Sequence, residues 1–375
     1  MSSRFARSFS SLAWANLAAQ SAEQLCLAAV PIVAVLLLGA GPGQVGALAT
    51  AQSLPFLLLS IPLGLLADRY SRRGLMVWSE LLRAFALLGL LAAVMAGQLS
   101  MPLLVLLGFI GAVGTVGFSV AAPALGGALV SFAGASAAFA LASALSIFAV
   151  VLLLRLKEPA RAPVPPRHPW IELREGAGMV WQHALLRPIL LTSLAWNFSW
   201  FVLQAAYVPY AVRMLSLDAA GVGFTLAAYG AGMVVGALLA ARVAAALPFG
   251  RAIQLGPLVS VLAALVMVLT LVWPAGLLAA CAFFLFGAGP IVWTITSTTL
   301  RQTVTPHAML GRVSSIFLTA NTGARPLGAA LGGLVGLLWG EPACLVLALM
   351  GFCVQAWIIM RSVVSELQHL PAVPA

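Results

Sequence analysis

Charged side chains are scarce in this sequence: they make up 7% of its 375 residues, whereas 62% are hydrophobic. Soluble domains carry roughly 25% charged residues, so the composition excludes a soluble enzyme. Lysine occurs once, as Lys157, and a leucine precedes it, which excludes the phosphate-binding G-x-x-x-x-G-K-[ST] loop of an ATP-driven pump. The sequence also lacks a serine nucleophile elbow, and its four histidines have no metal-ligand spacing. We therefore expect no enzyme activity and no metal or other cofactor.

Basic residues give the chain a formal net charge of +10, but they form no continuous basic face. They lie in short segments at alternate ends of apolar runs, where Lys and Arg set the orientation of a membrane protein. This distribution argues against a nucleic-acid partner and in favour of contact with the lipid bilayer. Assigning the arginine-rich loops to the cytoplasm places both termini there too. We expect a monomeric, multi-pass protein of the cell inner membrane.

Apolar runs of about 20 residues recur along the chain, each long enough to cross a hydrocarbon core of about 30 Å. They predict an all-α polytopic protein with spans at 10–38, 44–67, 75–96, 101–121, 136–155, 186–212, 219–246, 252–273, 276–300, 311–338 and 342–361. Residues 156–183 are rich in prolines and charged residues and are predicted to be a linker, with an amphipathic helix over 170–183. The predicted domains are an N-terminal bundle (1–155), a cytoplasmic linker (156–185), a C-terminal six-helix bundle (186–361) and a cytoplasmic tail (362–375).

The two predicted bundles share a short repeat. LGGALVSFAGASAAFALA begins at Leu125, and LGGLVGLLWGEPACLVLA begins at Leu331. The glycine pairs of this repeat allow close helix packing, and they are Gly126, Gly127, Gly332 and Gly333. An internal repeat about an axis along the membrane normal is one layout of secondary transporters.

The part of each half that runs from its fourth span to its last span is shorter in the first half than in the second. It runs over 101–155, against 275–361 in the second half, so that about 32 residues are missing and the join falls near 122–126. Either residues 123–133 form a half-span, or one long tilted helix crosses once over 101–133. We favour the half-span, because a single crossing puts Arg155 and Lys157 outside. The fold is then about 11 full transmembrane helices plus one half-span, a 12-helix plan with its fifth helix truncated.

A motif stands at the end of the second predicted span: GLLADRYSRR. It resembles G-x-L-A-D-R-x-G-R-R, the signature between helices two and three of the major facilitator superfamily, with Ser71 in place of the second glycine. The resemblance implies a cytoplasmic gate that latches the two halves in the outward-open state. Its residues here are Gly64, Asp68, Arg69, Arg72 and Arg73. A carboxylate such as Asp68 at the C-terminal end of its own helix opposes the helix dipole, so it needs a partner elsewhere.

Three further segments, IELREGAGMVWQHALLRPILL, TPHAMLGRVSS and NTGARPLGAALGG, resemble the drug:proton antiporters that include macrolide and enterobactin exporters. The resemblance implies two pseudo-symmetric bundles and proton-coupled efflux of a small amphipathic compound, drug-like or siderophore-like. Two features depart from the family. The span 101–121 has no arginine, and the fifth-helix antiporter motif survives only as APALGGAL. The alternative is therefore a truncated protein that keeps the fold as a remnant or a scaffold without transport.

Ionisable residues deep inside spans are costly and usually functional. By depth we select Glu23, flanked by two glutamines, and Arg325, near an asparagine. Glu23 would carry a proton or meet a cationic group, and Arg325 would meet an anionic group or pair with Glu23. A fixed ion pair is the structural alternative. The predicted substrate and proton cavity comprises Gln20, Glu23, Gln24, Asn197, Asn321 and Arg325.

Other intramembrane residues are open to structural interpretations. Trp196, Trp200 and Tyr207 could line the same cavity, or belong to the bundle core or to an aromatic belt at the membrane interface. Glu80 and Arg83 are predicted to form an i,i+3 pair near the cytoplasmic face. The glycines of the span 219–246 are predicted to pack helices closely, and they are Gly223, Gly230, Gly232 and Gly236.

Overall fold

The computed structural model describes residues 29–69, 71–121, 135–154 and 169–371, together with positions 14, 15, 18, 19, 22, 23 and 26. For residues 60–69, 72, 117–121, 135–138, 169, 170, 172 and 308 the description covers the backbone alone. All regular elements in the described ranges are helices, which confirms the predicted all-α class. The chain divides into two units, residues 1–166 and 167–375. The division falls within the predicted linker.

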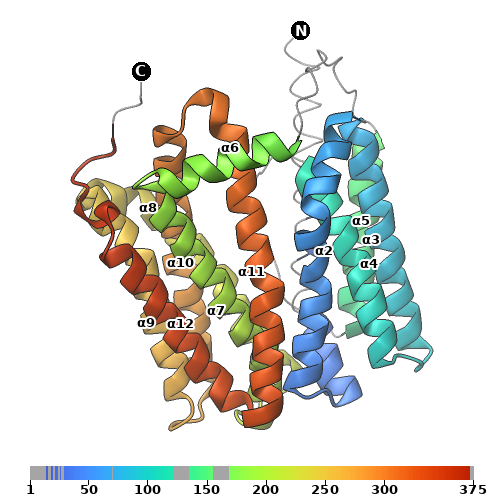
Figure 1. Ribbon diagram of the computed structural model, residues 1–375. Helices are drawn as coiled ribbons and strands as arrows, with labels where there is room; N and C mark the ends of the chain where they lie inside the picture. Colours follow the sequence, from blue (N-terminus) through green and yellow to red (C-terminus); the bar gives the residue numbers. More distant parts are fainter. Residues whose placement is uncertain are drawn as a thin grey trace. The chain divides into compact units, whose positions relative to one another are not determined.

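The N-terminal unit is built around α3. Its long helices are α2 (Pro42–Arg69), α3 (Arg72–Met95), α4 (Met101–Ala121) and α5 (Ala135–Leu154), preceded by a helical segment, Ala29–Leu38. Helix α3 packs against α4 and α5, and α2 packs against α4 (Figure 1). Ser71 begins α3 as its N-cap, because its hydroxyl accepts a hydrogen bond from the Gly74 N–H at 3.0 Å.

The C-terminal unit contains six long helices and one short one. They are α6 (Pro169–Gln182), α7 (Leu186–Arg213), α8 (Ala219–Ala246), α9 (Phe249–Leu269), α10 (Gly276–Val304), α11 (Leu310–Trp339) and α12 (Glu341–Met360). Helix α7 packs against α11 and α12, whereas α10 packs against α8 and α9. The short helix α6, predicted within the linker, lies against α11 and α7 (Figure 1). The six long helices of this unit thus form two groups of three, α7–α11–α12 and α8–α9–α10.

The observed helices agree closely with the predicted spans. Helix α8 has the predicted bounds, α9 begins at Phe249 instead of residue 252, and α10 continues to Val304 instead of residue 300. Within the described residues, six helices are long and apolar enough to cross a membrane: α3, α7, α8, α9, α10 and α12. The predicted half-span over 123–133 lies outside the described residues, as do Gly126 and Gly127.

Glycines bring α8 and α10 into direct backbone contact. A Cβ atom at Gly232 would collide with the carbonyl oxygen of Phe284, and one at Gly236 would collide with the carbonyl oxygen of Ala288. The predicted packing role is therefore confirmed for these two glycines. It is wrong for Gly223 and Gly230, because a Cβ atom at either would have open space around it.

The segment after α12 folds back onto the C-terminal unit. The N–H of Gly250 donates to the carbonyl of Leu367 at 2.7 Å, and the N–H of Phe249 donates to that of Gln368 at 3.2 Å. These bonds satisfy donors at the N-terminus of α9, which a helix leaves without internal partners. The first residues of the predicted tail are thus a capping element of α9.

Candidate ligand cavity

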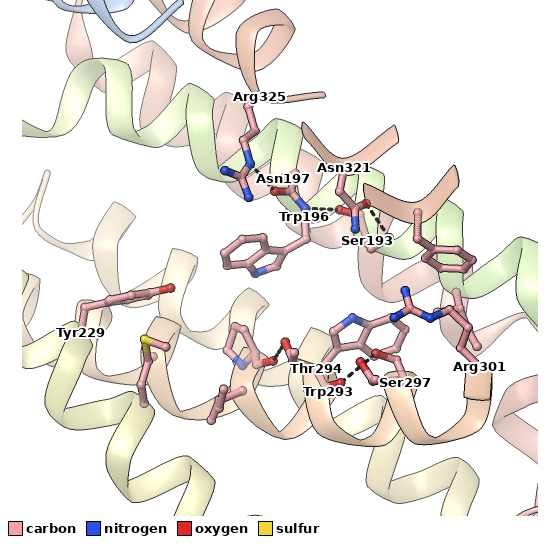
Figure 2. A pocket seen from close by; sticks show the side chains of 17 residues that line it. Ser193, Trp196, Asn197, Tyr229, Trp293, Thr294, Ser297, Arg301, Asn321 and Arg325 are labelled. Atoms are coloured by element: carbon pink, nitrogen blue, oxygen red, sulfur yellow. Dashed lines mark hydrogen bonds between the residues drawn. The ribbon is translucent and has the colours of Figure 1, made fainter. Parts of the chain in front are cut away.

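A cavity of about 370 Å³ opens inside the C-terminal unit. Helices α7 and α11 form one side, α10 forms the opposite side, and Tyr229 and Met233 come from α8 (Figure 2). The α7 and α11 residues that line it are Ile189, Ser193, Trp196, Asn197, Phe317, Asn321 and Arg325. The α10 residues are Gly287, Pro290, Ile291, Trp293, Thr294, Ser297, Thr298 and Arg301. Its volume is in the range of pockets that bind drug-sized ligands.

Three residues of the predicted site come together on the α7–α11 side. The Nε of Arg325 donates to Oδ1 of Asn197 at 3.4 Å, and Nδ2 of Asn197 donates to the carbonyl of Ser193 at 2.9 Å. The Ser193 hydroxyl donates to Oδ1 of Asn321 at 2.8 Å, so one polar network joins the two helices. Figure 2 shows this network at the edge of the cavity. The predicted grouping of Asn197, Asn321 and Arg325 is present in the structure.

Helix α10 contributes a polar face on the opposite side. Pro290, Thr294, Ser297 and Arg301 follow one another at helical spacing of three or four residues and all line the cavity. The Thr294 hydroxyl donates to the carbonyl of Pro290 at 2.8 Å. Its proton is thereby used within the helix, which leaves the oxygen lone pairs as its remaining capacity towards the cavity.

Arg301 is a cavity residue that sequence reasoning assigned only to the orientation of the chain. Its guanidinium lies over the ring of Phe317, 4.8 Å from the centroid. Its Nε is buried and has no hydrogen-bond partner. The spacing with Pro290, Thr294 and Ser297 was the signal that could have identified it, because a polar stripe along an apolar helix marks one face.

Aromatic rings line part of the cavity and pack behind it. Trp196 stacks on Trp200 with their centroids 5.4 Å apart, and Trp200 stacks on Tyr229 at 5.1 Å. Trp196 and Tyr229 line the cavity, whereas Trp200 is buried behind them and Tyr207 lies in the core. The indole Nε1 of Trp196 is buried without a hydrogen-bond partner. The two interpretations of these aromatics therefore apply to different residues: Trp196 lines the cavity, and Trp200 and Tyr207 pack the core.

The charge of the lining is entirely positive. Among its residues are two arginines, Arg301 and Arg325, and no aspartate, glutamate or histidine. Both arginines are half-buried, and positive charge partly withdrawn from water is costly unless hydrogen bonds or an anion compensate it. The cavity therefore suits a ligand that brings hydrogen-bond acceptors or negative charge.

Buried charge in the N-terminal unit is arranged differently. Arg83 contacts Glu80 at 2.6 Å and donates from Nε to the Ser146 hydroxyl at 3.1 Å. The predicted i,i+3 pair is confirmed, and its side chains are 3% and 0% exposed, so it is an interior pair. Oε1 of Glu80 has no hydrogen-bond partner. Glu23 and Cys26 interact electrostatically with this pair.

Glu23 is thus found beside Glu80 and Arg83 and is half-buried. Its predicted meeting with Arg325 stays a prediction, because the two residues belong to different units. Gln20 and Gln24 lie outside the described residues.

The predicted gate motif is described mostly by its backbone. Gly64, Asp68 and Arg69 lie in the last turns of α2, and Arg72 begins α3. The side chain of Arg73 donates to the carbonyls of Leu153 and Leu154 at 3.1 and 2.5 Å. These are carbonyls at the C-terminus of α5, which a helix leaves unpaired and which favour a cation. Arg73 therefore joins α3 to α5.

The second glycine pair lies on the inner side of α11. A Cβ atom at Gly332 would come 2.8 Å from the carbonyl oxygen of Val202 and 3.0 Å from Cβ of Ala205, both on α7. Gly333 is buried on α11. The close approach at Gly332 holds α11 against α7, which carry the Arg325–Asn197–Ser193–Asn321 network.

Comparisons with known proteins match nearly the whole chain. The sequence pattern described as Major Facilitator Superfamily matches residues 105–329, and the pattern described as Transmembrane secretion effector matches residues 9–120. The enterobactin exporter EntS of Shigella flexneri is 31% identical over 59% of this chain and 51% of its own. EntS of Escherichia coli K12 is 28% identical over 68% of this chain and 60% of its own. The chain thus spans about half to three fifths of the length of these curated relatives.

Solved structures share the fold at low identity. The nucleoside transporter NupG superposes with a TM-score of 0.64 over 96% of this chain and 98% of its own, at 12% identity. A bacterial homologue of the human lysosomal transporter Spinster gives a TM-score of 0.65 over 96% and 97%, at 13% identity.

Proposed function

The chain belongs to the major facilitator superfamily, and we propose that it is a secondary active transporter that exports a small amphipathic compound. It works by alternating access, with proton influx driving efflux across the cell inner membrane. The observation that carries the proposal is the polar, aromatic cavity between α7, α8, α10 and α11. Polar groups inside an apolar helical bundle are costly, and they mark a substrate path more often than a packing device.

The substrate is a small amphipathic molecule, drug-like or siderophore-like. The cavity offers the rings of Trp196 and Tyr229 together with hydroxyl, amide and guanidinium groups. Such a lining binds a molecule with both an apolar ring and polar substituents. The relatives named as enterobactin exporters support export of a small molecule.

Alternating access moves the two units against each other around the bound compound. The close backbone contacts of α8 with α10, and of α11 with α7, make the walls of the C-terminal cavity stiff. The motif from Gly64 to Arg73 serves as the cytoplasmic gate, with Asp68 meeting a partner that is close in one conformation alone. Both termini are cytoplasmic, the lipid bilayer surrounds the helices, and the transporter works as a monomer.

Proton coupling is assigned to Glu23. Its carboxyl group is half-buried in the N-terminal unit and interacts electrostatically with Glu80, which bonds Arg83. Carboxyl groups inside helical bundles of transporters can take up and release protons. Protonation of Glu23 thus changes the charge of this cluster, which provides a switch between conformations.

An efflux assay tests the proposal. The chain is produced in a bacterial host that lacks its own efflux pumps, and accumulation of a macrolide, enterobactin and an amphipathic dye is measured. For any compound exported, flux is then measured in proteoliposomes with an imposed pH gradient and a pH-sensitive dye. We expect efflux that depends on the gradient. Unchanged accumulation of every compound would favour the alternative of a transport-inactive protein that retains the fold.

Two matched variants on α10 assign the flux to the cavity. Thr294 lines it and bonds only within its own helix, so Thr294→Trp fills the cavity without breaking a contact between helices. Ile295 is exposed and is not among the lining residues, so Ile295→Trp is the control. The indole takes up volume that the compound needs, so efflux should fall about tenfold or more in Thr294→Trp, which corresponds to about 1.4 kcal/mol of binding, and stay near the parent rate in Ile295→Trp.

A further inference from the structure

We infer that the cavity of the C-terminal unit selects an organic anion that carries a flat aromatic ring. The inference rests on the proposed function in one respect: it takes this cavity as the site where the exported compound binds. It goes further by fixing the charge and the shape of that compound.

The charge follows from the lining. Arg325 on α11 and Arg301 on α10 face the cavity from opposite sides, and none of the other lining residues is acidic (Figure 2). Arg301 also lies over the ring of Phe317, which supports a cation without neutralising it. A cationic ligand entering here meets two like charges, whereas an anion gains from both. A carboxylate or a phenolate can also accept two N–H bonds from one guanidinium.

The hydrogen-bonding inventory points the same way. Two buried N–H groups of the lining, Nε of Arg301 and Nε1 of Trp196, have no acceptor. Unpaired buried donors are costly, so each favours a ligand that supplies an acceptor. Two amide oxygens of the lining already accept a bond each: Oδ1 of Asn197 accepts from Arg325, and Oδ1 of Asn321 accepts from Ser193. An organic anion supplies the acceptors that these two N–H groups lack.

The aromatic stack sets the shape of the ligand. The rings of Trp196 and Trp200 are nearly parallel, with an angle of 11° between their planes, so Trp200 covers one face of the Trp196 ring. Trp196 lines the cavity, and Tyr229 and Trp293 line it from α8 and α10. A flat ring that enters the cavity can therefore extend the stack, while its anionic group reaches an arginine. Stacked aromatic pairs contribute beyond the burial of their area.

Three ligands of one shape and different charge test this inference. They are 2-naphthoate, 2-naphthamide and 2-(aminomethyl)naphthalene, which are anionic, neutral and cationic at neutral pH. Binding to the purified full chain in lipid nanodiscs is measured by equilibrium dialysis, with empty nanodiscs as the blank. We expect naphthoate to bind at least about tenfold more tightly than the amide, and the amine to bind more weakly than both. Equal binding of the three, tightest binding of the amine, or no binding of naphthoate would overturn the inference.

Arginine variants locate the preference. Arg301→Gln and Arg325→Gln should each weaken naphthoate binding about tenfold and leave amide binding unchanged. Arg301→Lys and Arg325→Lys keep the charge and should keep naphthoate ahead of the amide. Arg213→Gln is the control, because Arg213 on α7 pairs with Glu341 at 3.2 Å and does not line the cavity. The inference would be overturned if the glutamine variants bound none of the three ligands and neither lysine variant kept the preference of the parent. That result would assign the arginines to folding.

The failure of the anion site and the failure of the proposed function can be told apart. Selective binding of naphthoate without efflux of any compound would remove the proposed function and keep the anion site. Efflux that Thr294→Trp blocks, in a chain that binds the three naphthalenes equally, would keep the function and remove the anion site.

Discussion

The two units of this chain arrange the charges inside their helices in different ways. In the N-terminal unit Arg83 and Glu80 are in direct contact at 2.6 Å, and Ser146 accepts a further bond from the arginine. In the C-terminal unit Arg301 and Arg325 line a cavity that contains no acidic residue. The first arrangement pairs its cation with a carboxylate of the protein, whereas the lining of the second contains two arginines and no carboxylate. We propose that the buried pair serves structure and conformational switching, and that the half-buried arginines of the cavity serve recognition.

The largest effect should follow from removing one partner of the buried Arg83–Glu80 ion pair. Arg83→Ala leaves Glu80 as an uncompensated buried charge, which costs about 3–5 kcal/mol of folding free energy. We expect the variant to melt far below the parent in detergent, as followed by thermal unfolding of the purified protein. The matched control removes both charges, in Glu80→Gln combined with Arg83→Met, and should recover most of the loss. If the single variant is as stable as this double variant, the pair does not hold the unit together.

A smaller loss should follow from separating the helices that form the cavity. Gly232→Leu places a side chain against the backbone of Phe284, and overpacking of this kind costs about 1–3 kcal/mol. Gly230→Leu, two residues away on the same helix, enters open space and should be neutral. The comparison is read from the melting temperature of each variant. Equal melting temperatures would show that the contact between α8 and α10 is not tight.

Separation of roles between the units can be tested at Glu23. Glu23→Gln removes the titratable proton, so efflux driven by a pH gradient should fall at least about tenfold, which corresponds to about 1.4 kcal/mol. Binding of 2-naphthoate should not change, because the cavity lies in the other unit. Efflux and binding are measured on the same preparation. Parent-level efflux in Glu23→Gln would contradict the proton role.

The smallest effect is expected at the surface of the C-terminal unit. Arg312 on α11 contacts Glu175 on α6 at 2.5 Å, and the Glu175 side chain is 46% exposed. Solvent-exposed ion pairs contribute about 0.2–1 kcal/mol, so a double-mutant cycle with Arg312→Ala and Glu175→Ala should give a coupling energy in this range. Unfolding of the four proteins in denaturant provides the measurement. A coupling comparable with the loss in Arg83→Ala would show that α6 is a structural clamp.

Sequence patterns predicted the helices well because apolar length is itself the physical requirement for a span. Helix α8 has its predicted bounds, and the polar residues of α7 and α11 that were assigned to one cavity lie together. Arg301 was missed as a cavity residue, because the distribution of arginines along the chain reports orientation and says nothing of which way a side chain turns within the last turn of a helix.

The depth at which a residue is buried was harder to predict than the partner with which it interacts. Glu80 and Arg83 were recognised as a pair from their spacing, but their depth in the core depends on how α4 and α5 pack around α3. The packing role of glycines was right at Gly232 and wrong at Gly230, because spacing along one helix does not reveal which face its neighbour occupies. The unpartnered N–H of Trp196 is likewise a property of the three-dimensional surroundings.

The measurement that tests the account most directly is protection of a single thiol in the cavity. Thr294→Cys and Ile295→Cys are made separately in a chain whose four native cysteines are replaced, and labelling by a maleimide is timed with and without an exported compound. The account predicts that the compound slows labelling at position 294 and leaves position 295 unchanged. Unchanged labelling at both positions, for a compound that the chain exports, would contradict the claim that this cavity holds the substrate.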